Sequence, residues 1–344
     1  MNIEIKTSRE IRLASHPTGV LLPEHLMIAE TTLPAPASND LVVRNRWFRV
    51  SISTRLMAMQ GAEAVNGIPF PALKPGDALE DGAIGEVISC PPQSGFQVGD
   101  FVSHPMGWRE YAIVDASHCV ALGSQPIDPV AYLGHGWTAY AALTRGIQIS
   151  DGDTVFVSSG AGAIGSMAGQ IARKLGARRV IGSTSTQDKA DWMKADLGYD
   201  AVVMRNGRPI IEQLAEAAPE GIDVFVDMVG GEQLAAAAVV ARAGARFVLL
   251  GALTAELDAR ESSILAPVEL DSFQLILKGI TLRGYSACDD DSDAFDEWLQ
   301  CLQEWRRGTG FRLAYTKFTG IENAPQALHE ACAGKLKGIV IVEL

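Results

Sequence analysis

Residues 154–165 read Thr-Val-Phe-Val-Ser-Ser-Gly-Ala-Gly-Ala-Ile-Gly, and this stretch decides the fold. Thr154–Ser158 reads as a buried strand, and Ala163–Leu175 carries apolar residues at helical spacing. Between them, Gly160-Ala161-Gly162-Ala163-Ile164-Gly165 fits the pattern Gly-x-Gly-x-x-Gly. Gly160 is expected to permit a tight turn, Gly162 to let a pyrophosphate approach the backbone, and Gly165 to let the helix pack closely on the strand. With the free N–H groups of the helix N-terminus, residues 160–165 predict dinucleotide binding.

The residues that follow favour a phosphorylated dinucleotide. A site for NADH has an acidic residue about 20 positions further on, where it accepts the ribose hydroxyls. The corresponding stretch here, Val180–Thr186, contains no acid but contains Ser183 and Ser185. Lys189 follows in the next expected helix, and Arg205 follows the third strand. Hydroxyls and cations suit a ribose 2′-phosphate, so we expect NADPH as the cofactor.

The composition is that of a globular protein. The chain has 344 residues, 47% of them hydrophobic, which excludes collagen-like, coiled-coil and disordered classes. The net charge of −12 argues against nucleic acid as a partner, because phosphate binding needs a basic face. No membrane span is expected, because Arg242 and Arg246 interrupt the longest apolar stretch. The first ten residues lack the apolar core of a signal peptide, and five scattered cysteines favour a cytoplasmic location.

The chain changes character near residue 150. Before it, brief β-type runs alternate with Pro- and Gly-rich stretches, which predicts a compact, mostly antiparallel unit. After it, strands alternate with helices, which predicts an α/β fold with a parallel, doubly wound sheet. A last apolar strand, Gly338–Val342, is expected to rejoin the first unit. The domains are therefore predicted as 1–126 completed by 315–344, which binds substrate, and 127–314, which binds the cofactor.

The chain resembles the zinc-free medium-chain dehydrogenases/reductases, in the branch of prostaglandin reductases and alkenal double-bond reductases. The motifs that carry the resemblance are spread over nearly the whole chain: Gly107-Trp108-Arg109-Glu110-Tyr111, Gly136-Trp137-Thr138-Ala139-Tyr140, Gly160 to Gly165, Asp227-Met228-Val229-Gly230-Gly231 and Arg283-Gly284-Tyr285. The resemblance implies a GroES-like substrate domain, a Rossmann domain that binds NADPH, and a homodimer. It also implies cofactor contacts from Thr138 and Gly251.

A catalytic metal is not expected. Zinc-dependent relatives carry Gly-His-Glu near the fourth strand and a Cys-rich lobe. The equivalent stretch here reads Asp81-Gly82-Ala83-Ile84-Gly85-Glu86, and no cysteine lies between Cys90 and Cys119. Three ligands with an open position are therefore not supplied.

The substrate side departs from the branch's usual pattern. Ser53-Thr54-Arg55 stands where Asp-Pro-Tyr is usual, Glu256 where a Tyr is usual, Leu336 where an Asn is usual, and Gly134-His135-Gly136 where Met-Pro-Gly is usual. Without a metal, hydride transfer needs a polarised acceptor such as an α,β-unsaturated carbonyl compound, whose developing oxyanion needs hydrogen-bond donors. Arg55, His135 and Tyr285 are the candidate donors, and Glu256 is a candidate proton donor if burial raises its pKa.

Three functions remain open at this stage. The first is NADPH-dependent reduction of a conjugated carbon–carbon double bond. The second is quinone reduction, which uses the same hydride chemistry. The third is an NADPH-binding sensor or structural protein without turnover, which the altered substrate-side motifs would permit.

Overall fold

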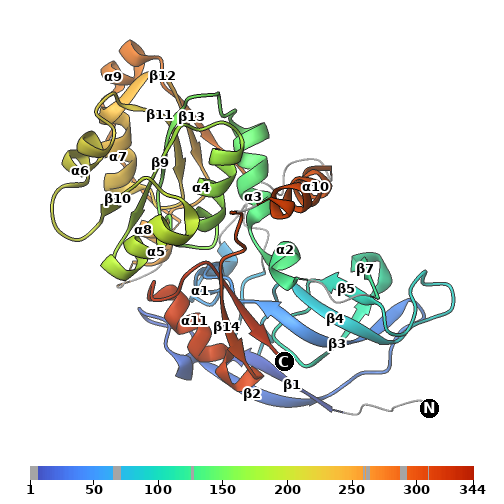
Figure 1. Ribbon diagram of the computed structural model, residues 1–344. Helices are drawn as coiled ribbons and strands as arrows, with labels where there is room; N and C mark the ends of the chain where they lie inside the picture. Colours follow the sequence, from blue (N-terminus) through green and yellow to red (C-terminus); the bar gives the residue numbers. More distant parts are fainter. Residues whose placement is uncertain are drawn as a thin grey trace.

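The computed structural model describes residues 7–64, 71–124, 128–258, 260, 264–286, 293–308 and 310–344. Two large sheets organise these residues, one in each half of the molecule (Figure 1). The fold class expected from the sequence, a mostly β unit beside a doubly wound parallel sheet, is confirmed. In the acidic run 289–293, only Asp293 lies within the described residues, and it begins a helix.

The first sheet has seven strands. Its order is β14-β15-β3-β4-β5-β7, and β6 also pairs with β3. The strands are β3 (Asp40–Arg49), β4 (Ala83–Ser89), β5 (Phe101–His104), β6 (Tyr111–Asp115), β7 (Val120–Gly123), β14 (Tyr315–Thr319) and β15 (Ile339–Glu343), and a separate antiparallel pair is formed by β1 (Thr7–Leu13) and β2 (Leu26–Thr32). β15 runs antiparallel to β3, so the last strand does rejoin the first unit. This pairing supports the proposed division of the chain into two domains.

The second sheet has six parallel strands. They are β8 (Thr154–Val157), β9 (Arg179–Thr184), β10 (Ala201–Met204), β11 (Ile222–Asp227), β12 (Ala241–Leu249) and β13 (Thr281–Gly284). Their order, β10-β9-β8-β11-β12-β13, is the doubly wound arrangement in which the strand order reverses between β8 and β11.

Helices connect the strands of both units, and helices of the second unit cover both faces of its sheet. They are α1 (Ser53–Met57), α2 (Pro129–Leu133), α3 (Gly136–Ala141), α4 (Gly165–Lys174), α5 (Gln187–Leu197), α6 (Ile210–Ala217), α7 (Gly231–Val240), α8 (Leu253–Glu256), α9 (Ser272–Lys278), α10 (Asp293–Arg307) and α11 (Ala324–Cys332). α10 lies beside α3 (Figure 1), and within the described residues five shorter 3-10 or π turns join other elements.

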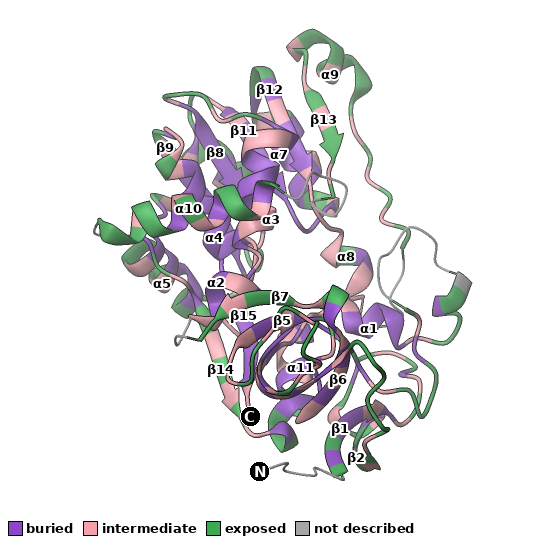
Figure 2. Ribbon diagram, turned by 90° about the vertical axis from the view of Figure 1, so that its right-hand side faces the viewer, coloured by how far each residue is buried: buried purple, intermediate pink, exposed green. Residues whose placement is uncertain are grey.

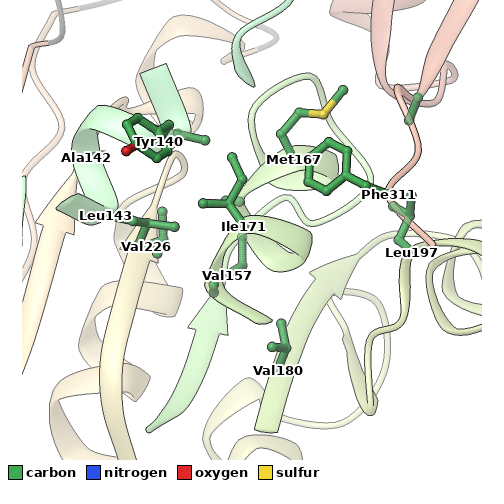
Figure 3. Close-up of a cluster of buried hydrophobic side chains, with 14 of the residues drawn as sticks. Tyr140, Ala142, Leu143, Val157, Met167, Ile171, Val180, Leu197, Val226 and Phe311 are labelled. Carbon is green, nitrogen blue, oxygen red and sulfur yellow. The ribbon is translucent and has the colours of Figure 1, made fainter. Parts of the chain in front are cut away.

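Successive apolar side chains of the central strands point to opposite faces of the sheet, and they form the two cores of the second unit. Val155 and Val157 pack on one face of the sheet with α4, where Val157, Ile171 and Val226 lie close together (Figure 3). Phe156 points to the other face and stacks on Phe225, with ring centroids 4.9 Å apart. A parallel strand buried on both faces needs this continuous apolar sequence. The central strands are accordingly buried along their length, whereas α9 is mostly exposed (Figure 2).

Candidate active site

A cavity of about 490 Å³ opens at the point where the strand order reverses. Ser159 follows β8 and Met228 follows β11, and both residues line it. The first unit contributes Val50–Ser53, and the C-terminal segment contributes Gly338–Val340. The carboxyl ends of the strands beside such a reversal are the usual binding place in open α/β sheets. The cavity therefore lies between the two units and is built by both.

The glycine turn forms one wall of this cavity. A Cβ on Gly165 would lie 2.2 Å from the Ser159 carbonyl oxygen, so only glycine lets α4 begin this close to the strand, as the sequence predicted. A Cβ on Gly162 would lie 2.9 Å from the Ser159 Oγ, so a side chain there would crowd the turn, and Gly162 lines the cavity. The turn itself places its positive φ of 50° at Ser159. Gly160 serves close packing instead, because its Cβ would lie 2.4 Å from Met193 Cε.

Cations gather where a ribose phosphate would lie. Lys189 and Arg205 line the cavity together with Thr184 and Ser185. Lys189 is buried, and its Nζ donates to the Gly334 carbonyl oxygen at 2.6 Å. Burial, together with the positive charges of Arg205 and Lys337, lowers the pKa of Lys189. An anion placed here would relieve that repulsion, so the wall fits a dinucleotide that carries a 2′-phosphate.

Ser183 has a different role from the one expected. Its side chain is buried, it donates a hydrogen bond to Gln233, and its Oγ accepts from the Ser159 backbone N–H at 3.0 Å. It therefore holds the glycine turn and does not line the cavity. Thr184, which sequence reasoning passed over, lines the cavity in its place. Successive side chains of a strand point to opposite faces, so an inward-facing Ser183 places its neighbour Thr184 on the other face.

Glu256 and His135 lie on the part of the cavity that the first unit completes. Glu256 ends α8, and its Oε1 accepts from the Ala252 backbone N–H at 3.4 Å. Burial raises the pKa of Glu256, while hydrogen bonds from Ala252 and from the Ser53 side chain oppose the rise. Ser53 also lines the cavity, so a residue of α1 reaches across to α8. The predicted condition for Glu256 as an acid, a pKa raised by burial, is present.

His135 is electrically neutral at physiological pH. Burial and the nearby Arg49 charge lower the pKa of its imidazole to about 3. Arg49 is itself held by Asp81, whose Oδ1 accepts from the Arg49 Nε at 2.8 Å. His135 precedes α3 and lines the cavity. It can donate a hydrogen bond from a neutral ring, but it cannot serve as an imidazolium acid.

Arg55 lies in α1 and is not among the residues that line the cavity. It is 2% exposed and donates to two backbone carbonyl oxygens, that of Gly19 at 3.0 Å and that of Asp258. Gly19 belongs to the first unit, and Asp258 follows α8. Arg55 thus joins the first unit to the segment that carries Glu256, and this geometry supports a positioning role.

Two further candidates also lie outside the cavity lining, as do Gly160 and Ser183. Tyr285 follows β13, where its backbone N–H donates to the Leu249 carbonyl oxygen at 3.0 Å and its ring lies against Gly146. Thr138 lies in α3, half-buried. The remaining cofactor candidates line the cavity, and these are Ala161, Gly162, Ala163, Ile164, Gly165, Ser185, Lys189, Arg205 and Gly251.

Sequence reasoning missed the contribution of the C-terminal segment. Ala331–Gly334, Leu336 and Gly338–Val340 line the cavity, and the Gly338 N–H donates to the Ala161 carbonyl oxygen at 2.9 Å. That bond attaches the approach to β15 directly to the glycine turn. The available signal was the glycine at position 338 just before the last strand, because glycine permits a close backbone approach, and its φ in the structure is +67°.

A glycine turn at a strand-order reversal, with cations beside it and a second unit closing the cavity, defines a dinucleotide-dependent oxidoreductase. Comparisons with known proteins agree. The family model described as "N-terminal domain of oxidoreductase" matches residues 9–122, and the model described as "Zinc-binding dehydrogenase" matches residues 163–304.

Relatives match over nearly the whole chain. Prostaglandin reductase 1 of Bos taurus is 29% identical, covering 96% of this chain and 97% of its own. The NADP(+)-dependent 2-alkenal reductase of Nicotiana tabacum is 26% identical, covering 98% and 97%. The crystal structure of CurA from Vibrio vulnificus in complex with NADPH superimposes with a TM-score of 0.86 at 28% identity, covering 97% and 98%. The chain belongs to the medium-chain dehydrogenase/reductase superfamily, in the zinc-free branch of the prostaglandin and alkenal reductases.

No helix in the described part of the chain is long and apolar enough to cross a membrane.

Proposed function

We propose that this protein transfers a hydride from NADPH to the β-carbon of an α,β-unsaturated carbonyl compound, without a metal. That it is an NADPH-dependent reductase follows from its superfamily and from the Lys189 and Arg205 wall, and it agrees with the cofactor named for the relatives. The observation that carries the finer proposal is Glu256, a carboxyl group with a raised pKa on the wall that the first unit completes.

Each part of the cavity has a task in this reaction. When bound, NADPH supplies the hydride for the β-carbon. The glycine turn and α4 hold the pyrophosphate, and Lys189 and Arg205 hold the 2′-phosphate. These contacts determine how far the cofactor enters the cavity. The substrate is then expected to bind against the wall that includes Ser53 and His135.

Negative charge develops on the carbonyl oxygen during hydride transfer, so hydrogen-bond donors must face that oxygen. The neutral His135 ring and the Ser53 hydroxyl are donors that line this part of the cavity. Glu256, whose pKa burial raises, is the proposed donor of the proton to the α-carbon. Arg55 is proposed to hold α8 in place rather than to touch the substrate.

The test compares two panels of acceptors, conjugated enones and enals against quinones, with NADPH oxidation followed at saturating cofactor. The proposal expects enones to be reduced to saturated ketones with the higher kcat/KM. Efficient quinone turnover without enone turnover would replace it by the quinone reductase alternative. Tight NADPH binding with no oxidation across both panels would identify a binding protein instead.

The homodimer and the cytoplasmic location implied by the sequence are part of this proposal. β13 forms one edge of the six-stranded sheet, and Phe273, Ile276 and Leu277 on the neighbouring α9 are more than half exposed. An open strand edge beside exposed apolar side chains suits association of two copies. Light scattering on the purified protein tests this, and a monomer at micromolar concentration would refute it.

A further inference from the structure

The segment that leads from α11 to β15 contacts α5 through two lysines. Lys189 of α5 donates from its Nζ to the Gly334 carbonyl oxygen of the segment at 2.6 Å. Lys337 of the segment reaches α5, where its Nζ lies 2.7 Å from Asp188 Oδ2 and 5.5 Å from the centre of the Trp192 ring. Asp188 and Trp192 are four positions apart, so they lie on one face of the helix. Lys337 therefore packs against the first turns of α5.

The backbone of Lys337 is fixed by the first unit, whereas its side chain is partly exposed. Its N–H donates to Thr316 Oγ1 at 3.3 Å, and the same hydroxyl donates to the Lys337 carbonyl oxygen at 2.8 Å. Thr316 lies in β14, which pairs with β15. The Lys337 side chain is 31% exposed and the Asp188 side chain 80% exposed. An ion pair this exposed contributes little free energy, so Lys337 can exchange Asp188 for a stronger anion at small cost.

The charges around Lys189 match those of a phosphate monoester. The charges of Arg205, Lys337 and Asp188 act on the Lys189 ammonium. These four side chains carry three positive charges and one negative charge, which leaves a net charge of +2. A phosphate monoester carries about −1.5 to −2 at neutral pH. One such group would therefore balance the cluster.

The Lys337 ammonium lies within reach of a phosphate at this place. Lys337 does not itself line the cavity, but its neighbours Leu336 and Gly338 do. The Gly338 N–H donates to the Ala161 carbonyl oxygen at 2.9 Å, so the segment is held against the glycine turn. A lysine carries its ammonium on a flexible stem of four carbons. Rotation of that stem can move the ammonium from Asp188 toward the cavity while the backbone stays in place.

We propose that Lys337 is a third ligand of the 2′-phosphate of NADPH, and that Asp188 holds its ammonium until the phosphate binds. This rests on the part of the proposed function that assigns the 2′-phosphate to Lys189 and Arg205. The phosphate is then bound by cations from both units, because Lys337 belongs to the segment that returns to the first sheet. The preference for NADPH over NADH thus depends on the C-terminal segment as well as on α5.

Lys337→Met measures this contribution, because Met keeps an apolar stem and removes the charge. The Kd of NADPH is expected to rise by about 3- to 10-fold, and the Kd of NADH to change by less than about twofold. Lys337→Arg keeps the charge and should restore most of the preference. Isothermal titration calorimetry without an acceptor measures both constants, so the result does not depend on whether enones are the substrates.

Lys335→Met is the matched control, because Lys335 is an exposed lysine of the same segment, and both constants should stay at their wild-type values. An unchanged Kd of NADPH in Lys337→Met, or equal weakening of both cofactors, would overturn the proposal. A normal loss in Lys189→Ala beside no loss in Lys337→Met refutes this inference alone. No selective loss in Lys189→Ala would refute the phosphate assignment on which the inference rests.

Asp188→Asn tests the exchange of partners. The substitution frees Lys337 and removes a charge that repels phosphate, so the Kd of NADPH is expected to fall by about two- to fivefold. The gain should be smaller when Asp188→Asn is combined with Lys337→Met, because no ammonium is then released. An equal gain in both backgrounds would show that Lys337 stays with Asp188 and would overturn the role given to that carboxylate.

Discussion

Replacing Lys189 by alanine should weaken binding of NADPH and leave binding of NADH almost unchanged. Lys189 is 7% exposed and lines the cavity, where the positive charges of Arg205 and Lys337 act on it. Its Nζ donates a hydrogen bond to the Gly334 carbonyl oxygen, and a phosphate oxygen of the cofactor can replace that acceptor. The substitution also removes repulsion within the cationic cluster, so we expect little loss of folded-state stability.

The magnitude follows from the kind of bond that is lost. A charge-assisted hydrogen bond in a partly buried site contributes about 1.5–3 kcal/mol. The Kd of NADPH should therefore rise by about 10- to 150-fold. NADH lacks the 2′-phosphate, so its Kd should change by less than about threefold. Isothermal titration calorimetry, or quenching of tryptophan fluorescence, measures both constants on the same preparation.

Lys194 supplies the control, because it is an exposed lysine on the same helix, α5. Lys194→Ala should change neither constant, which separates the local contact from the general loss of one positive charge. Equal weakening of both cofactors in Lys189→Ala would refute the phosphate role and would point to a distorted cavity.

The other predictions concern the substrate side and stability. Arg55→Met removes the hydrogen bonds to the carbonyl oxygens of Gly19 and Asp258, so urea titration should show a loss of about 3 kcal/mol in the free energy of unfolding. Rescue of kcat/KM by Arg55→Lys would contradict a role that needs both bonds. The kcat for enone reduction should fall as pH rises through the raised pKa of Glu256, and this limb of the profile should vanish in Glu256→Gln. Burial lowers the pKa of both His104 and His135 to about 3. The unfolded chain binds these protons below about pH 6.5 and the folded chain does not, so the free energy of unfolding should fall as pH drops from about 6.5 to 3. A His104→Gln variant with an unchanged pH slope in urea titrations would contradict that.

The sequence predicted the cofactor half of the molecule well because its signals are local. The strand, the glycine turn and the helix lie within residues 154–175, and Gly162 and Gly165 lie close to Ser159, which is near them in the chain. Gly162, Gly165, Lys189 and Arg205 all line the cavity. Ser183 was expected to contact the cofactor, but it does not line the cavity, because it lies inside the strand and its side chain donates to Gln233.

The substrate half was harder to predict because it depends on contacts between distant segments. Arg55 is 203 residues from its partner Asp258, so its engagement with that carbonyl could not be inferred from either stretch alone. Gly338 reaches Ala161 only because β15 returns to pair with β3. The departure from the usual Asp-Pro-Tyr identified Arg55 as an unusual residue, but only the three-dimensional structure shows that its Nη2 donates to the carbonyl oxygens of Gly19 and Asp258.

The destination of the hydride tests the central claim most directly. NADPH carrying deuterium at the transferable position of the nicotinamide is incubated with the enzyme and 4-phenyl-3-buten-2-one, and the product is examined by NMR. We expect one deuterium at the β-carbon of the saturated ketone and a hydrogen from solvent at its α-carbon. Deuterium on the carbonyl carbon of an allylic alcohol would contradict it.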